Sequence, residues 1–178
     1  MSYFRLRMDA EEKARQVLKK FGPPIIPIDT TEVAKRLGIV VHALPLDDEL
    51  SGMAFCEGGQ RTIIVNSTHH LHRRRFTAAH EIAHHVLEHI DDDVHVDTSV
   101  FHRNARSRTG EDSKEVQANA FAAELLMPRS ILKTFGRIDV LDDMAISRLA
   151  REFKVSHSAM AIRIENLNDN LNAKQHSS

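Results

Sequence analysis

His80-Glu81-Ile82-Ala83-His84 is the stretch of sequence on which the interpretation of this chain depends. In a helix, residues four positions apart lie on the same face, so both imidazoles could bind one metal ion from a single rigid element. Glu81 would point about 100° around the helix axis from His80, near the ion without binding it. That position suits a general base acting on the water that a metal ion activates. The stretch therefore predicts a helix that carries a metal site.

The surrounding residues favour this helix. Apolar residues recur at spacings of three and four positions, as on one face of a helix: Phe76, Ala79, Ala83 and Val86. Residues 66–68 (Asn-Ser-Thr) offer N-capping side chains, and the acidic run at 91–93 predicts the end of the helix. The competing interpretation is an amphipathic helix with incidental histidines, because the chain contains 12 His.

A catalytic zinc site usually has three protein ligands, so a third must come from another element. The longer zinc signature does not fit, because Leu87 and Ile90 stand where it needs Gly and His. Residues 115–127 are rich in alanine and good helix formers, and Pro128 closes the run. Glu115 is the best candidate ligand there, with Asn119 one turn further as a possible hydrogen-bond partner of a ligand. Three other acids stay open as alternatives: Glu111, Asp112 and Glu124.

Two motifs together resemble one known family. Residues 75–85 (RFTAAHEIAHH) and 115–128 (EVQANAFAAELLMP) are similar to the central motifs of the ImmA/IrrE family of bacterial metallopeptidases. Residues 22–27, 50–53 and 64–70 resemble the family's earlier segments. The match extends downstream to residues 149–163, so it covers nearly the whole chain.

This resemblance implies a set of roles. His80, His84 and Glu115 would be the zinc ligands and Glu81 the catalytic base. The family's studied members cut helix-turn-helix repressors and so relieve repression. Many relatives carry an N-terminal DNA-binding module, whereas this chain is expected to be the stand-alone form. Zn²⁺ is the expected cofactor, and residue type alone leaves Mn²⁺ or Fe²⁺ open.

Composition sets broad limits on location and partners. The 178 residues suit one domain of ordinary size, and the formal net charge of −1 demands neither a nucleic acid nor a membrane partner. No apolar run is long enough to span a membrane, and the N-terminus lacks the apolar core of a signal peptide. Cys56 is the single cysteine, so no internal disulfide can form. Together these features predict a cytoplasmic protein, of oligomeric state that the sequence leaves open.

The expected fold class is α+β, a zincin-like peptidase whose small, mostly antiparallel sheet packs on the metal-binding helix pair. Helices are predicted at 9–21 and from Asp29 or Thr30 to Leu37, and strands at 39–44, 52–57 and 61–66, the last two joined by a hairpin at Gly58-Gly59. An edge strand is expected within 95–101, and a mobile loop over 102–112. The predicted organisation is a peptidase domain over 1–135, a helical segment over 136–168 packed on it, and a disordered tail over 169–178.

The helical segment invites a second interpretation. Its apolar residues are spaced as in a helix-turn-helix motif. The second helix of that motif would present His157, Ser158 and Arg163 to a ligand. That is little positive charge for phosphate contacts, so no direct nucleic-acid binding is expected. Stabilisation of the oxyanion is assigned to no single residue; His95, His102 and Arg103 are the candidates.

The sequence thus predicts a zinc-dependent endopeptidase that hydrolyses a peptide bond in a cytosolic regulator, most simply a helix-turn-helix repressor. Two alternatives belong to other classes of protein. One is a metal-containing anti-repressor that displaces a repressor without cutting it, and the other is a DNA-binding regulator that uses the C-terminal helices.

Overall fold

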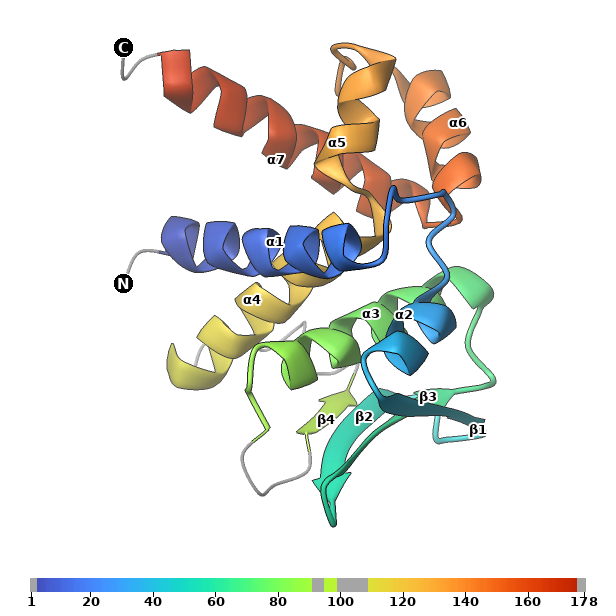
Figure 1. Cartoon of the computed structure of the whole chain (residues 1–178). Helices are drawn as coiled ribbons and strands as arrows, with labels where there is room; N and C mark the ends of the chain where they lie inside the picture. The colour runs from blue at the N-terminus through green and yellow to red at the C-terminus, as the bar shows by residue number, and fades with distance from the viewer. Residues whose placement is uncertain (1–2, 91–94, 99–108, 176–178) are drawn as a thin grey trace.

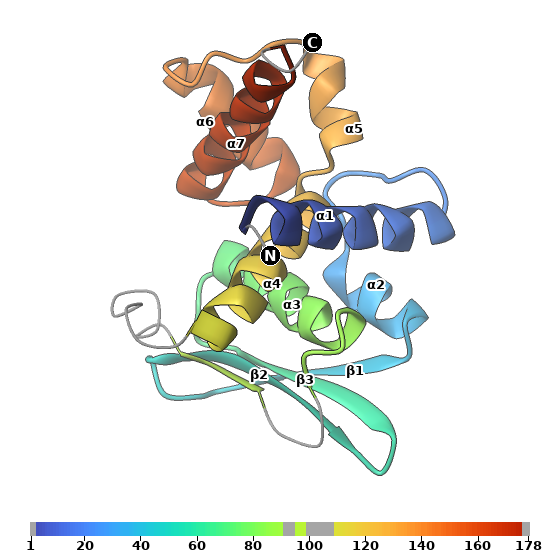
Figure 2. The same ribbon diagram turned by 90° about the vertical axis from the view of Figure 1, so that its left-hand side faces the viewer.

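The computed structural model describes residues 3–90, 95–98 and 109–175, in which a small sheet lies at one end and helices cover one of its faces (Figure 1). The helices are α1 (Tyr3–Lys20), α2 (Thr30–Arg36), α3 (Leu71–Val86), α4 (Thr109–Leu126), α5 (Arg129–Leu132), α6 (Asp143–Phe153) and α7 (His157–Gln175), with a 3₁₀ turn at Lys133–Phe135. The strands are β1 (Ile39–Leu44), β2 (Leu50–Glu57), β3 (Gln60–Asn66) and β4 (His95–Thr98). Both views place α3 next to the sheet, α4 and α1 beyond it, and α5 to α7 farthest away (Figures 1 and 2). The expected α+β class is confirmed.

The strand order is β1-β3-β2-β4. β2 pairs antiparallel with both β3 and β4, whereas β1 pairs parallel with β3. Gly58 and Gly59 join β2 to β3 with φ of 56° and 81°, a left-handed turn that glycine adopts without a steric cost. The hairpin is therefore as predicted, and the strand expected within 95–101 is the edge strand β4. The parallel pair was not predicted from the sequence.

The sheet presents its small and branched residues to α3. Ala54 and Ile63, which are paired in register, and Ile82 of α3 have no exposed surface. At Gly52 of β2 the backbone itself contacts the helix: a Cβ there would lie 2.6 Å from Cγ2 of Thr77 and 2.8 Å from the carbonyl oxygen of Ile64. The spacing between β2 and α3 therefore depends on the absence of a side chain at this position.

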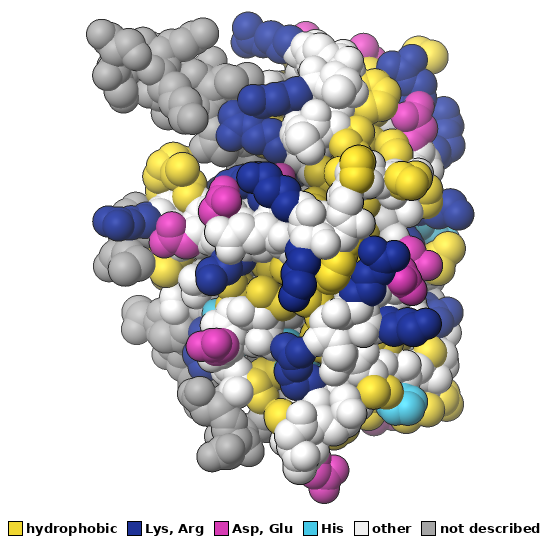
Figure 3. Space-filling view, viewed as in Figure 1, with side chains coloured by type: hydrophobic (Ala, Val, Ile, Leu, Met, Phe, Trp, Pro, Cys, Tyr) yellow, Lys and Arg dark blue, Asp and Glu magenta, His cyan; other side chains and the backbone are white. Residues whose placement is uncertain are grey.

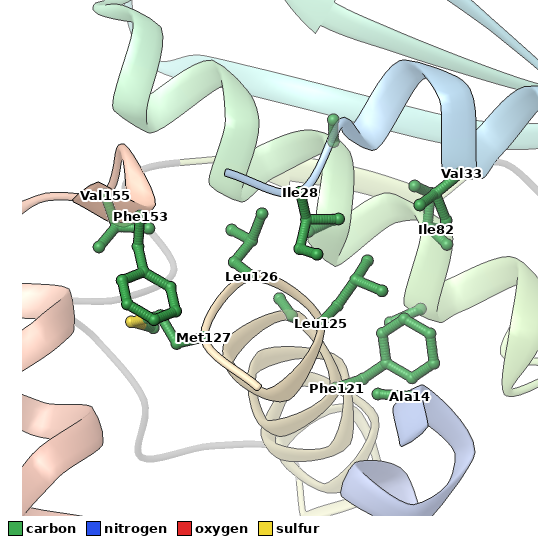
Figure 4. Packing of buried hydrophobic residues seen from close by; sticks show 14 of the residues in the cluster. Ala14, Ile28, Val33, Ile82, Phe121, Leu125, Leu126, Met127, Phe153 and Val155 are labelled. Carbon is green, nitrogen blue, oxygen red and sulfur yellow. The ribbon is translucent and has the colours of Figure 1, made fainter. Parts of the chain in front are cut away.

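Helix α4 runs through the middle of the core. Figure 4 shows Phe121, Leu125 and Leu126 directed into the packed interior, and all three are fully buried. The core continues past the end of α4, where Met127 lies beside Phe153 and Val155 (Figure 4). The C-terminal helices thus share one continuous hydrophobic core with the rest of the molecule.

A buried ionic cluster ties α7 to the same core. The guanidinium of Arg163 is 2% exposed; it donates to Oε1 of Glu11 at 2.7 Å, to Oε2 of Glu124, and to the carbonyl oxygen of Met127 at 3.2 Å. The two glutamates come from α1 and α4, so one cation from α7 joins three helices. The interpretation in which Arg163 is presented to DNA is therefore wrong, because this side chain pairs with two buried carboxylates. Nη1 of Arg15 adds a second positive charge, 3.8 Å from Oε2 of Glu11 and 3.7 Å from Oε2 of Glu124.

Several predicted boundaries are wrong. Helix α1 begins at Tyr3 rather than near residue 9, and α3 ends at Val86, before the acidic run at 91–93. The N-cap of α3 is His70, whose Nδ1 accepts from the backbone N–H of His72 at 3.3 Å, not a residue within 66–68. Residues 169–175, expected to be disordered, continue α7.

Asn66 does not cap α3 but makes hydrogen bonds to the backbone of the loop between β1 and β2. Its Nδ2 donates to the carbonyl oxygens of Leu46, Asp47 and Leu50 at 3.2, 3.1 and 2.9 Å, and its Oδ1 accepts from the backbone N–H of Leu46 at 3.2 Å. One fully buried amide therefore satisfies the backbone of the loop between β1 and β2.

Candidate metal centre

Close packing of α3 on α4 creates the site. Ala79 and Ala83 of α3 and Ala118 and Ala122 of α4 have no exposed surface. These small side chains let the two helices approach closely, and Glu115 of α4 therefore lies opposite the two histidines of α3. The alanine-rich stretch is thus a helix, as predicted, and it packs directly on α3.

The three side chains converge on one point. Oε2 of Glu115 lies 3.1 Å from Nε2 of His80, and Oε1 lies 3.4 Å from Nε2 of His84. The two Nε2 atoms are 3.1 Å apart. Ligands of a tetrahedral zinc ion at about 2.1 Å from it are separated by roughly 3.4 Å, so these distances suit a shared ion. Among the described residues, these three form the group of nitrogen and oxygen donors close enough to hold a metal ion.

Both imidazoles are oriented through their other nitrogen. Nδ1 of His80 lies 3.2 Å from Oδ1 of Asn119, and an amide oxygen only accepts, so Nδ1 carries the proton. The lone pair of Nε2 is then directed to the shared point. Nδ1 of His84 lies 3.2 Å from Nδ1 of His89, which can accept in the same way. The geometry therefore presets both rings for binding through Nε2.

The carboxylate of Glu115 is held in its charged form. Burial alone would raise its pKa, but hydrogen bonds from His80 and His84 outweigh burial and hold the pKa well below its ordinary value. A metal ion requires the deprotonated carboxylate. A bound ion would take the place of the Nε2 protons that make these hydrogen bonds, so the site would offer it one anion and two imidazole nitrogens, a donor set that suits Zn²⁺ and leaves a coordination position for a further ligand.

Glu81 lies next to the ligands without being one of the converging three. Its side chain is fully buried, and its Cγ is 3.7 Å from the position that a Cβ on Gly52 would occupy. The carboxylate side chain is therefore packed between α3 and β2, on the side of α3 that faces the sheet. A larger residue at position 52 would compete with Glu81 for this space.

The other predicted site residues have different outcomes. The structure places Glu124 in the ionic cluster with Arg163, about two and a half turns from Glu115 along α4. The side chains of Glu111 and Asp112 lie outside the described residues, as do those of His95, His102 and Arg103. His89 was not among the predicted site residues. Its position follows from the end of α3, where Glu88 has φ of 56° and the backbone N–H of His89 returns to the carbonyl oxygen of His84 at 2.9 Å.

Two histidines on one helix and a glutamate on the next are typical of metal-binding proteins. The model of the family of IrrE N-terminal-like domains, Peptidase_M78, matches residues 34–165, which include the whole site. The chain belongs to this family, as the sequence motifs predicted.

Two other proteins are similar to this chain. A Bacillus phage phi105 protein named "Uncharacterized immunity region protein 2" is 28% identical over 116 residues, which cover 65% of this chain and 69% of that protein. A solved Mycobacterium tuberculosis transcriptional regulator has a similar fold, with a TM-score of 0.55 at 17% sequence identity over 90% of this chain. The match spans about half (51%) of that regulator's length. In the described ranges, no helix is both long and apolar enough to cross a membrane.

Proposed function

We propose that this protein is a zincin-like, zinc-dependent endopeptidase that cuts a regulatory protein in the cytoplasm, with a helix-turn-helix repressor as the substrate. The observation that carries the proposal is the convergence of His80, His84 and Glu115, with Glu81 packed beside them. The similarity to an immunity-region protein and to a transcriptional regulator supports a regulatory substrate.

Each side chain has a distinct part in this reaction. His80, His84 and Glu115 would hold the ion, which when bound polarises the peptide carbonyl and makes water more acidic. Glu81 accepts the proton from the attacking water and donates it to the leaving amine. Asn119 and His89 keep the two imidazoles in the tautomer that presents Nε2.

Glu81→Gln tests the proposal, because it removes the base and keeps the shape of the side chain. The zinc-loaded full chain would be incubated with candidate helix-turn-helix repressors from its own genome. We expect the variant to keep one metal ion per chain and to cleave about 10²–10⁴-fold more slowly than the wild type. Glu57→Gln, an exposed change of the same kind on β2, is the control and should cleave normally.

Three results would contradict the proposal. Equal cleavage by Glu81→Gln would remove Glu81 from the chemistry. Full relief of repression by the uncleaving variant would favour the metal-containing anti-repressor. An operator shift by the purified chain alone, weakening steeply with salt, would favour the DNA-binding alternative. On the face seen in Figure 3, Lys and Arg side chains are spread over several elements among acidic and hydrophobic ones.

A further inference from the structure

A groove of about 940 Å³ lies between α4 and α7, and α1 and the start of α3 complete its walls. We call it the α4–α7 groove. Figures 1 and 2 both show α4 lying between α7 and α3. Apolar side chains from three helices form much of its lining: Phe76, Val116, Ala120, Ala123, Met127 and Ile162. Ile162 is 57% exposed and extends this apolar lining to the surface.

The fixed charge of the groove is positive. Four of its lining residues are charged at neutral pH, and two of these, Glu11 and Arg163, neutralise each other at 2.7 Å. The remaining two are Arg7 of α1 and Arg73 of α3. Within the described part of the chain, no acidic side chain forms an ion pair with either arginine; Arg73 donates to Oγ of Ser51 at 2.9 Å. The groove therefore combines an apolar lining with two available cations.

The groove adjoins the candidate metal centre at one residue. Asn119 lines the groove, and Oδ1 of the same residue lies 3.2 Å from Nδ1 of His80. A segment bound in the groove would lie against the turn of α4 that orients a metal ligand. This proximity favours the substrate over a second copy of the chain as the occupant.

We propose that the α4–α7 groove binds an amphipathic, acidic segment of the substrate protein, a proposal that rests on the proposed function. Apolar residues of that segment would cover the lining, and its Asp or Glu side chains would pair with Arg7 and Arg73. Duplex nucleic acid fits less well, because the apolar lining offers phosphates no partner and two arginines give few contacts. The groove thus selects the substrate at a place separate from the bond that is cut.

Binding of a model peptide tests this directly. The probe is a fluorescently labelled helical peptide with Leu on one face and Glu on the other, and its counterpart has Lys in place of every Glu. Zinc-loaded full-length Glu81→Gln serves as the receptor, because it should bind without cutting. We expect the Glu peptide to raise the fluorescence anisotropy, with weaker binding at higher salt, and the Lys peptide to bind at least about tenfold more weakly.

Matched variants locate the site. Arg7→Glu with Arg73→Glu should weaken binding of the Glu peptide at least about tenfold. Lys13→Glu with Arg148→Glu makes the same change of charge at exposed positions outside the groove and should leave binding within about twofold. Arg7→Gln with Arg73→Gln adds no repulsion near Glu11, and should weaken binding by a smaller factor, so a folding defect of the first variant would not obscure the answer.

Three outcomes would overturn the inference: no binding of the Glu peptide, equal binding of both peptides, or equal loss in the control variant. A wild-type dimer that Arg7→Glu with Arg73→Glu dissociates, seen by sedimentation, would assign the groove to a second copy and also overturn it. Failure of the proposed function is distinguishable, because it would appear as absent cleavage by the wild type while groove binding persists. Cleavage that is insensitive to both arginines would refute the groove alone.

Discussion

Glu115 and Glu124 lie on the same helix, α4, and both carboxylates are held by side chains from other helices. Glu115 meets two imidazoles, and its side chain is 32% exposed. Glu124 meets the guanidinium of Arg163, and its side chain is 1% exposed. Hydrogen bonds from the imidazoles lower the pKa of Glu115, whereas burial raises the pKa of Glu124 against the opposing effect of Arg163.

The two groups differ in whether the partners of the glutamate can still bind a cation. Imidazoles that are neutral contribute lone pairs, so the Glu115 group is a set of acceptors that a cation can complete. A guanidinium has only donors and a permanent charge, so the Glu124 group is already complete. The same residue type on one helix is therefore suited to bind an ion in one place and to join helices in the other.

Removing the cation from the structural cluster should give the largest effect. Arg163→Met leaves Glu11 and Glu124 buried together with only the partly exposed Arg15, 3.7–3.8 Å away, as a cation, and we expect the free energy of unfolding to fall by about 3 kcal/mol. Urea unfolding of the full chain measures this loss. Arg148→Met, at an exposed position of α6, should change stability by less than about 0.5 kcal/mol. Equal losses in both variants would show that the buried cluster does not join the helices.

The second prediction separates the two glutamates by metal binding. Glu115→Gln removes a ligand, so zinc affinity should fall more than about a hundredfold, since even an outer hydrogen-bond partner contributes about 10–100-fold. Glu124→Gln should leave the affinity nearly unchanged. Competition with a chromogenic chelator measures both variants. The comparison breaks down if Glu124→Gln weakens zinc binding as much as Glu115→Gln does.

Asn119 offers a finer test of the metal centre. Asn119→Ala removes the acceptor for Nδ1 of His80 and should lower zinc affinity about tenfold. Asn119→Asp keeps an acceptor at that place and should restore most of the affinity. A purely structural role for Asn119 would instead show both variants with the same loss.

The smallest expected effect is a dependence of stability on pH. Because burial raises the pKa of Glu124 in the folded state, the folded chain binds more protons than the unfolded chain between the ordinary and the raised value. The free energy of unfolding contributed by this group therefore falls as pH rises through that window. In Arg163→Met the pKa should rise further, so its stability loss should be smaller near about pH 5 than near about pH 7.5.

This measurement is made on metal-free protein, so that release of an ion does not contribute. Adding Glu124→Gln to the Arg163→Met variant should make its stability loss much more nearly equal at the two pH values. A stability loss that is identical at both would contradict the assignment of the raised pKa to Glu124.

Local patterns in the sequence predicted much of the fold and of the site. Spacing along α3 placed His80 and His84 together, and the glycine pair marked the hairpin between β2 and β3. These features depend on residues close in sequence, whose geometry a helix or a turn fixes. Helix ends were less predictable. The N-cap of α3 is a histidine, which is not one of the usual capping residues, and the chain leaves the helix at Glu88 through a positive φ that the sequence does not indicate.

Contacts between distant segments could not be predicted in the same way. From spacing alone, Glu115 and Glu124 were both candidate ligands, and only the packing of α3, α4 and α7 separates them. The partner of Glu124 lies 39 residues away, on a helix whose arginine looked like a surface residue. His89 gave no signal, because it reaches His84 only after α3 has ended.

Position 52 has a consequence for how this protein can vary. Because backbone atoms of β2 and side-chain atoms of Thr77 meet there, the distance between sheet and helix beside Glu81 does not depend on which aliphatic residues fill the rest of the interface. Substitutions such as Ile63→Val can be absorbed by local repacking. A methyl group added at Gly52 cannot, since it would force the strand away from the helix and carry the candidate base out of alignment with the two imidazoles.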